Sequence, residues 1–253
     1  MKVIALMNTG NDADIIELSI RHNLKHLSKI VVLDNNSQDG TREIIDNLIV
    51  EFPSRISMLY THSKNTSEHM YTTNFIKQQI LDFDDPDYLI VLDADEFIKA
   101  ENLIELSSIP SNHVGFIKWK CYIPNSLDHK NFPEEMHYRR DREPEGCHKV
   151  IMPRGVEGHL ILGNHYLHQG ADSHRAPSYE LQTISLAHYP VRSLDQMNKK
   201  IDFISNFLKY ESPTQSYHLR NAKHLETLDE LIKKALLYAT VDKEKFELVY
   251  DPL

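Results

Sequence analysis

Two carboxylates stand two residues apart directly after an apolar run. Residues 88–92 (YLIVL) are apolar with β-branched members, which predicts a buried strand. Asp93 ends this run and Asp95 follows it, and in an extended chain residues i and i+2 point to the same side. Paired carboxylates suit Mg²⁺ or Mn²⁺. Ligands of open α/β sheets bind beyond the carboxyl ends of the strands, so Asp93 and Asp95 are candidate metal ligands. The alternative is a solvated turn or a helix N-cap.

The elements that must position these acids alternate between strand and helix. Apolar runs predict strands over 2–7, 30–33, 56–60 and 88–92, and helical spacing predicts helices over about 11–26, 41–49 and 66–81. Such alternation implies right-handed βαβ units and a mainly parallel sheet. Asp34 ends the second strand, so it faces the same edge of the sheet as Asp93. After Pro110 we expect short strands over 114–122, 149–152, 159–162 and 183–188, and helices from Ser193 onward.

Composition excludes several classes of protein. The 253 residues carry 28 basic and 37 acidic side chains, a net charge of −9, which argues against a general nucleic-acid partner. The two cysteines, Cys121 and Cys147, form no CxxC pair and favour a reducing compartment. No apolar stretch approaches the ~18 residues that span a bilayer. We therefore expect a cytoplasmic protein, and contact of the helical last 60 or so residues with the inner face of the membrane stays an open alternative.

Four motifs in order resemble one family. They are the helix start Asn11-Asp12, the loop DNNSQDGT at 34–41, the element DADEF at 93–97 and HYPVRS at 188–193. Over about residues 1–200 the chain resembles a family-two-type glycosyltransferase of the glycosyltransferase A (GT-A) fold. Two departures are Asp12, where the subgroup usually has Glu, and the lack of a basic residue after the first strand.

The resemblance implies an α/β fold with a Rossmann-like, mostly parallel central sheet flanked by helices and a helical C-terminal region. It implies one domain over 1–253, with a nucleotide-sugar-binding half at 1–112, an acceptor-side half at 113–192 and helices at 193–253. The implied reaction is metal-dependent inverting transfer of a sugar from a nucleotide donor, with UDP favoured. The implied acceptor is a glycan or glycolipid of a surface polysaccharide or lipopolysaccharide.

The resemblance also implies roles for individual residues. Asp95 and Asp93 hold Mn²⁺ or Mg²⁺, although Asp93 could instead bind the ribose. A late histidine often completes such a site, and His188 and His165 are the candidates. The residues expected to contact the nucleotide or its diphosphate are Asn8, Asn11, Asp34, Asn36, Asp93 and Arg192. For Arg192, capping of the following helix is an equal alternative, and for the loop at 34–41 the alternative is a structural turn.

Inversion requires a general base, usually a carboxylate. The irregular segment 124–148 offers Glu134, Glu135, Asp141, Glu143 and Glu145. Chain position alone favours Asp141 or Glu143, and Glu96 beside the acid pair is another candidate. The same segment has a basic cluster, His137, Arg139, Arg140 and Arg142, to which His148, Lys149 and Arg154 could add. These side chains either bind an anionic substrate or form ion pairs with the neighbouring acids.

Two other functions remain open. A sugar-nucleotide nucleotidyltransferase shares a related nucleotide-binding half, but it would favour a Gly-rich basic loop after the first strand, where this chain has NTGN at 8–11. A non-catalytic glycan-binding module could use the same scaffold. The intact acid pair argues against the module.

Overall fold

The computed structural model describes the chain except residues 64, 128–132, 134, 208–222 and 241–244. The chain forms two compact units. The first comprises residues 1–118 and 148–186, and the second comprises 119–147 and 187–253. The predicted division of labour between 1–112 and 113–192 stays a prediction.

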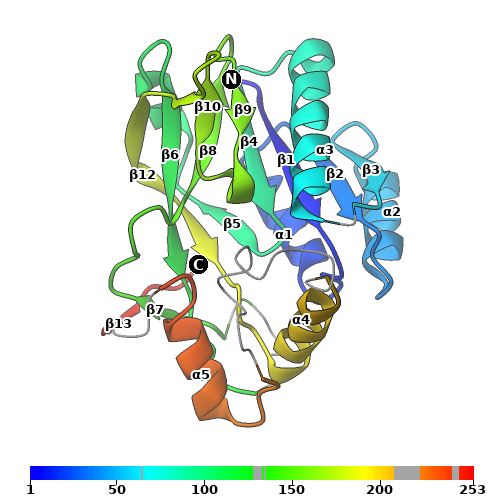
Figure 1. Ribbon diagram of the computed structural model, residues 1–253, viewed down its shortest axis with the longest axis vertical. Coiled ribbons are helices and arrows are strands. Elements are labelled where there is room, and N and C mark those ends of the chain that lie inside the picture. Colours follow the sequence, from blue (N-terminus) through cyan, green and yellow to red (C-terminus); the bar gives the residue numbers. More distant parts are fainter. Residues whose placement is uncertain (64, 128–132, 134, 208–222, 241–244) are drawn as a thin grey trace. The chain divides into compact units, whose positions relative to one another are not determined.

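Eight strands of the described chain form one sheet in the order β3-β2-β1-β4-β8-β6-β12-β5 (Figure 1). Strands β3, β2, β1 and β4 run parallel, whereas β8 is antiparallel to both β4 and β6. The predicted α/β fold, with a central sheet flanked by helices, is confirmed. The strands are β1 (Val3–Thr9), β2 (Lys29–Asn35), β3 (Ile56–Thr61), β4 (Tyr88–Asp93), β5 (Glu96–Lys99), β6 (Val114–Cys121), β8 (His148–Pro153) and β12 (Ser178–His188).

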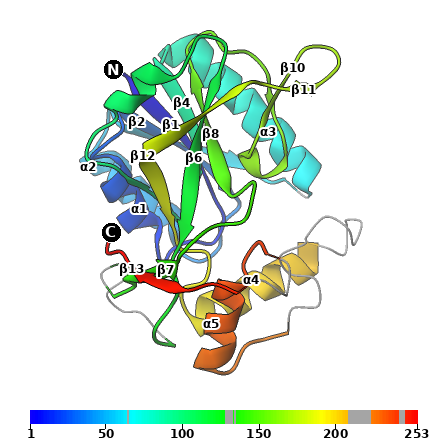
Figure 2. The same cartoon turned by 90° about the vertical axis from the view of Figure 1, so that its left-hand side faces the viewer.

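Successive strands are added to the sheet in one direction from β1 to β3, and the next strand, β4, lies on the opposite side of β1. Helices α1 (Ile16–Asn23) and α2 (Thr41–Glu51) lie on one side of the parallel strands, and α3 (Thr66–Gln79) lies on the other (Figure 2). This follows from right-handed crossovers, because the chain moves from β1 to β3 in one direction and returns past β1 to β4. The carboxyl ends of β1 and β4 therefore form a topological switch point, the usual ligand position in open α/β sheets.

Local chemistry moves some boundaries from their predicted places. Strand β1 continues through Thr9, and α1 begins later than the predicted Asn11 or Asp12. The cause is the Asp12 carboxylate, which accepts hydrogen bonds from the Thr9 hydroxyl (2.9 Å) and the Gly10 N–H (3.0 Å) and holds a turn there. Gly40 precedes α2 with a φ of 97°, a conformation that suits glycine.

Helix α3 is bound to a small second sheet in the same unit. This sheet consists of β9 (His159–Leu160), β10 (Leu167–Gln169) and β11 (His174–Arg175). The Asn74 side chain donates to the Leu160 carbonyl (3.0 Å) and accepts from the Leu160 N–H (2.8 Å), and the Lys77 ammonium donates to the Gly158 carbonyl. The first unit also has the short helical turns η1 (Ile80–Asp84), η2 (Ile104–Ser108) and η3 (Leu162–Asn164).

The second unit has its own core. Among its described residues, the helices are α4 (Leu194–Phe207) and α5 (Leu228–Leu236), and the short strands β7 (Tyr138–Arg140) and β13 (Leu248–Tyr250) pair antiparallel. Met197 and Ile201 of α4 pack in one apolar cluster with Leu231 and Ala235 of α5. None of the helices in the described part of the chain is long and apolar enough to cross a membrane.

A first prediction concerns Gly115, which faces Ile151 across β6 and β8. A Cβ added at Gly115 would lie 2.6 Å from Ile151 Cγ2 and 2.8 Å from Ile109 Cδ1. Because a branched side chain in a strand cannot retreat freely, Gly115→Ala should lower the free energy of unfolding by about 1–3 kcal/mol. Gly10→Ala is the control, since its added Cβ would meet no atom closer than 3.8 Å. Urea denaturation measures both, and equal midpoints would contradict this account of the packing.

Candidate functional site at the carboxyl ends of strands 1 and 4

Backbone hydrogen bonds fix the loop that carries the acid pair. The Asp93 N–H donates to the Glu96 carboxylate (2.8 Å), and the Ala94 N–H donates to the Asn8 carbonyl (3.1 Å). The chain turns at Ala94 and Asp95 instead of continuing extended, so the i, i+2 argument does not apply there. As a result, the Asp93 side chain is 42 % exposed, whereas Asp95 is buried.

Lys149 of β8 is a cation in direct contact with this loop. Its ammonium lies 2.6 Å from Asp93 Oδ2, 3.5 Å from Glu96 Oε1 and 3.1 Å from the Gly163 carbonyl oxygen. Both Lys149 and Glu96 are buried, and burial raises the pKa of Glu96 well above its usual range, against the effect of the Lys149 charge. Burial alone would lower the pKa of Lys149, but the charges of Asp93 and Glu96 outweigh it and raise that pKa. Lys149 is therefore an ammonium group held between the carboxylate of Asp93 and the buried carboxyl group of Glu96.

Buried polar atoms without partners surround the switch point. Asn8 pairs in register with Asp93, and its side-chain oxygen accepts a long hydrogen bond from Thr73 of α3 (3.5 Å). Among the described residues, Asn8 Nδ2, His69 Nδ1 and Asn164 Oδ1 have no hydrogen-bond partner. The charge of Asp93 acts on His69, although burial dominates and lowers the pKa of this histidine. Because an unpaired buried polar group costs about 1–3 kcal/mol, these atoms mark a place where a polar ligand or water would bind.

His165 lies beside the acid loop in the first unit. Its Nδ1 donates to the His148 carbonyl (2.7 Å), and its ring lies so close to Gly163 that an added Cβ there would meet the ring at 2.5 Å. Burial, with a further contribution from the Lys149 charge, lowers the pKa of His165 to about 4. The imidazole is therefore neutral at pH 7, the form that binds metals.

The side chains of this loop fit only the simplest kind of divalent-ion site, in which one or two carboxylates bind the ion together with the substrate. Within the described ranges, no three His, Cys, Asp or Glu side chains group as a metal cage. Mg²⁺ is commonly held by one or two carboxylates together with substrate phosphates, and Asp93 and Asp95 match that arrangement. The second oxygen of Asp93 makes no hydrogen bond with a described residue. Metal binding by Asp93, Asp95 and His165 stays a prediction.

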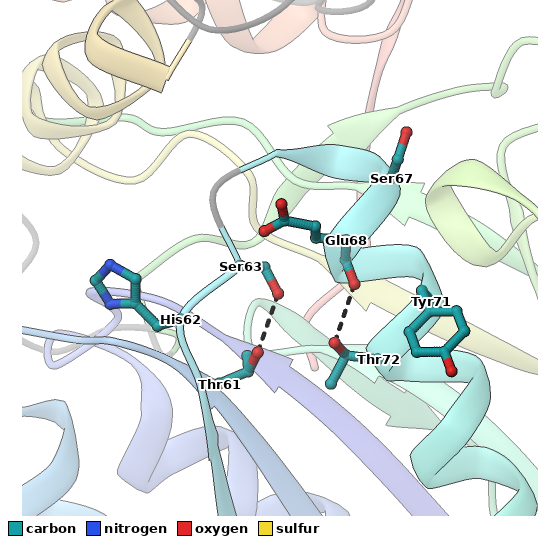
Figure 3. A pocket seen from close by; sticks show the side chains of 7 residues that line it. All are labelled: Thr61, His62, Ser63, Ser67, Glu68, Tyr71 and Thr72. Atoms are coloured by element: carbon teal, nitrogen blue, oxygen red, sulfur yellow. Dashed lines mark hydrogen bonds between the residues drawn. The ribbon is translucent and has the colours of Figure 1, made fainter.

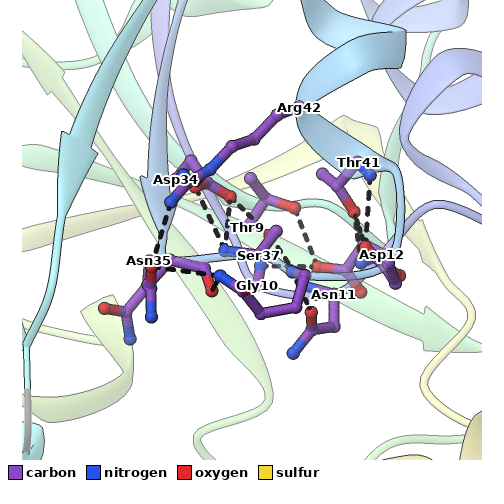
Figure 4. A network of polar contacts seen from close by, with 12 residues as sticks. Thr9, Gly10, Asn11, Asp12, Asp34, Asn35, Ser37, Thr41 and Arg42 are labelled. Atoms are coloured by element: carbon purple, nitrogen blue, oxygen red, sulfur yellow. Dashed lines mark hydrogen bonds and ion pairs between the residues drawn. The ribbon is translucent and has the colours of Figure 1, made fainter.

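The predicted nucleotide loops hold one another (Figure 4). Asp34 is fully buried, and its carboxylate accepts from the Ser37 hydroxyl, the Ser37 N–H (3.2 Å) and Arg42 Nε (2.7 Å). The Asn11 N–H donates to the Ser37 hydroxyl (2.9 Å), and Asn36 Oδ1 accepts from Arg42 (3.3 Å). These residues lie at the carboxyl ends of β1 and β2 as predicted, and the polar side chains also stabilise the loops. Their contact with a nucleotide stays a prediction.

A pocket of about 390 Å³ opens at the end of β3 and the start of α3 (Figure 3). Its lining is rich in hydroxyl groups and is made by Thr61, His62, Ser63, Ser67, Glu68, Tyr71 and Thr72. Tyr71 is 76 % exposed. Tyr60, which is nearby in the sequence, is exposed. The Arg42 guanidinium lies over its ring, with Cζ 4.8 Å from the centre of the tyrosine ring. The carboxyl edge of the parallel strands thus offers further polar and aromatic groups to a ligand.

The remaining predicted residues belong to the second unit. His188 is buried, with its Nδ1 3.4 Å from Cys121 Sγ and its ring 4.3 Å from that of Trp119. Arg192 is also buried, and its guanidinium donates to the Tyr189 carbonyl (2.9 Å), just before α4. Neither the metal role of His188 nor the diphosphate role of Arg192 is tested by these contacts.

The acids predicted as general base have protein partners. Glu143 pairs with the fully buried Arg140 and accepts the Cys121 N–H (2.7 Å). Asp141 pairs with Arg142 (3.0 Å) and accepts the Glu247 N–H (3.0 Å). The sequence offered surface ion pairs with these acids as the alternative for the basic cluster; the pair of Asp141 with Arg142 is of this kind, whereas the pair of Glu143 with Arg140 is buried. Glu134 lies outside the described residues, so the identity of the base stays a prediction.

Sequence reasoning missed part of the site. His69 and Thr73 gave no signal, because a polar residue on an amphipathic helix is ordinary. Lys149 gave a weak signal, because it is a charged residue beside the apolar residues of the run HKVIM. On sequence alone it is grouped with Arg154 as a possible addition to the basic cluster. Arg154 instead pairs with Asp85 (2.9 Å) and Asp87 (3.2 Å), before the first residue of β4, whereas Asp93 ends that strand.

Comparison with known proteins adds little. Neither models of protein families nor the sequences of curated proteins match the chain. Among solved structures, it resembles the mannosyltransferase PcManGT from Pyrobaculum calidifontis in complex with GDP-Man and Mn²⁺ (19 % identity, TM-score 0.37), covering 46 % of this chain and 35 % of that one. It also resembles S. aureus TarS 1–349 in complex with UDP (16 %, TM-score 0.44), covering 93 % and 71 %. A third is A197 from STIV (10 %, TM-score 0.36), covering 74 % and 85 %. The chain thus spans about a third of the mannosyltransferase, and at these values the likeness carries no argument about activity.

A second prediction separates a structural from a catalytic Glu143. Glu143→Gln leaves the buried Arg140 guanidinium without its counter-charge, so the free energy of unfolding should fall by about 3 kcal/mol. Asp141→Asn is the control and should leave it nearly unchanged, because its ion-pair partner Arg142 is exposed. Urea denaturation measures both variants. A Glu143→Gln protein as stable as wild type would show that this ion pair is not structural.

A third prediction uses His165. Its pKa falls from 6.5 in the unfolded chain to about 4 in the folded protein, so the unfolded state binds more protons between these values. Folding stability should therefore decrease as pH falls from 6.5 to about 4, with this histidine contributing on the order of 2–3 kcal/mol. His165→Gln should remove that part of the slope. Chemical denaturation of both proteins at several pH values measures it, and parallel pH profiles would contradict the assignment.

Proposed function

We propose that this chain is a metal-dependent, inverting glycosyltransferase of the GT-A type. It would move a sugar from a nucleotide donor, with UDP favoured, to a glycan or glycolipid acceptor in surface polysaccharide or lipopolysaccharide synthesis. One observation carries the proposal. At the switch point, Asn8 stands in register beside Asp93 on the neighbouring strand; its buried Nδ2 has no hydrogen-bond partner among the described residues, and the Asp93 carboxylate is half exposed. A hydrogen-bond donor beside an anionic group at this position suits a nucleotide diphosphate that binds with a cation.

The roles toward the metal ion and the nucleotide donor divide among residues of the first unit. Asp93 and Asp95 would hold the divalent ion, which when bound supplies positive charge to the diphosphate leaving group. Asn8 Nδ2 would donate a hydrogen bond to an oxygen of the nucleotide sugar, and Asn164 Oδ1 would accept a hydrogen bond from a hydroxyl group. Asp34, Asn36 and Asn11 would frame the nucleotide. The general base is proposed to be Asp141 or Glu143, with Glu96 as the alternative.

The proposed compartment is the cytoplasm, with the acceptor reached at the inner face of the membrane. Support for a reducing compartment comes from Cys121 and Cys147, which are both buried free thiols.

The decisive experiment is a panel of nucleotide sugars, tested by thermal shift with and without Mn²⁺ and followed by analysis of the products. Anything that binds the folded state raises its melting temperature, so a UDP-sugar with Mn²⁺ should stabilise the protein more than either alone. Release of UDP with transfer or hydrolysis of the sugar supports the proposal. Formation of UTP and sugar 1-phosphate when pyrophosphate is added to the UDP-sugar would indicate nucleotidyl transfer, and glycan binding without turnover would indicate a binding module.

A fourth prediction concerns Asp95→Asn. Loss of one candidate ligand should remove most of the Mn²⁺-dependent thermal shift with the donor and lower kcat/KM by roughly 100-fold or more, because charge development on the leaving group is then poorly stabilised. Glu101→Gln, an exposed acid after β5, is the control and should behave like wild type. Circular dichroism confirms that both variants fold. Wild-type turnover by Asp95→Asn would refute its metal role.

A further inference from the structure

A lysine buried in a sheet is unusual, and the contacts of Lys149 explain why it is charged there. Of the charged residues, lysine is among those that are almost never fully buried without a partner. Lys149 lies on β8, where its neighbours Val150, Ile151 and Met152 belong to the core. Its ammonium is 2.6 Å from Asp93 Oδ2 and 3.5 Å from Glu96 Oε1. One cation is thus fixed against two of the three acids in the sequence DADE.

The same ammonium also connects the acid loop to a second element. It lies 3.1 Å from the carbonyl oxygen of Gly163 in η3, the turn that also contains Asn164 and precedes His165. Gly163 has a φ of 81°, a left-handed conformation that glycine adopts freely. The Lys149 side chain therefore bridges two loops of the first unit, one acidic and one carrying the unpartnered amide oxygen of Asn164.

We propose that Lys149 is a built-in counter-ion of the acid loop and a positioning residue for Asp93. It occupies one oxygen of the Asp93 carboxylate and leaves the other, which makes no hydrogen bond with a described residue, for a ligand. Its charge keeps the affinity of the loop for a divalent ion low until a diphosphate adds negative charge of its own. The inference rests on the proposed function for the identity of that diphosphate, but the role of Lys149 toward a divalent ion does not require it.

The physical argument is one of charge. Asp93 and Asp95 alone would present two anionic groups to a divalent ion, as hard oxygen sites do. A fixed ammonium in contact with one of them repels a second cation, and the repulsion is strong because the ammonium is buried and poorly screened. A bound diphosphate reverses the balance, since it supplies oxygen ligands and negative charge at once. Ion and diphosphate then bind cooperatively.

The test measures Mn²⁺ binding to the full chain by electron paramagnetic resonance, without nucleotide and then with UDP. Lys149→Met keeps an unbranched side chain that is one heavy atom shorter and removes its charge, and Lys149→Gln removes the charge but keeps hydrogen-bond donors. In the absence of nucleotide, both should bind Mn²⁺ roughly tenfold more tightly than wild type, because one opposing charge is gone. The gain in Mn²⁺ affinity on adding UDP should shrink by a similar factor. Lys149→Arg keeps the charge and should resemble wild type.

Lys77→Met is the matched control. Lys77 is another buried lysine of the same unit, but its ammonium donates to the Gly158 carbonyl. Its loss should leave Mn²⁺ affinity unchanged, so a change common to both sites would indicate general damage to the fold and would overturn the proposal. Circular dichroism and urea denaturation establish that each variant folds, with Lys149→Gln as the variant that preserves polar contacts if Lys149→Met does not fold.

The results that would overturn the role of Lys149 differ from those that would refute the glycosyltransferase. Folded Lys149→Met and Lys149→Gln proteins that bind Mn²⁺ alone no more tightly than wild type would overturn the counter-ion role. Absence of Mn²⁺ binding by every variant at millimolar concentrations would overturn it as well. Failure of the wild-type protein to bind or turn over any nucleotide sugar would refute the glycosyltransferase, while the comparison made with Mn²⁺ alone would still decide the role of Lys149.

Discussion

Strand β1 is hydrogen-bonded to β2 on one side and to β4 on the other, and all three run in the same direction. This pairing sets Asn8 beside Asp93 on one side and Thr9 beside Asp34 on the other, with no freedom of register, because the strands are buried on both faces. Helices leave the sheet on opposite sides at this point, so the loops that follow β1 and β4 diverge. The site described above exists because of that divergence.

The polar groups at this edge divide into two kinds. Asp34, Ser37, Asp12 and Thr41 satisfy one another and hold the loops after β1 and β2 in shape. Asn8, His69 and Asn164 each have a buried side-chain atom that no described residue satisfies. The first kind explains why the loops keep a fixed shape without a ligand. The second kind explains where a ligand would gain hydrogen bonds, since stability alone would favour replacing these side chains by apolar ones.

The sequence predicted the parallel half of the sheet well, because β1, β2 and β4 are covered on both faces and appear as continuous apolar runs, and turn residues follow them. Strands β2, β3 and β4 and helix α2 lie within a few residues of their predicted ranges. Prediction was weaker wherever a contact is long-range. The partner of Asp93 is 56 residues away on an antiparallel strand, and no local pattern gives that register. The turn at Ala94 and the short strand β5 were missed for a similar reason, because hydrogen bonds from Glu96 and Asn8 override the extended conformation.

The amide side chain of Asn74 binds both main-chain groups of Leu160, much as a neighbouring strand would. On its other side, β9 pairs with β10, so at Leu160 the outer edge of this small sheet has no free donor or acceptor. Exposed strand edges are the usual template for unwanted association between chains, and proteins commonly protect them with charges, proline or a covering element. Here a single side chain from α3 closes the edge at that residue, so one helix both supplies polar groups to the switch point and guards against aggregation through β9.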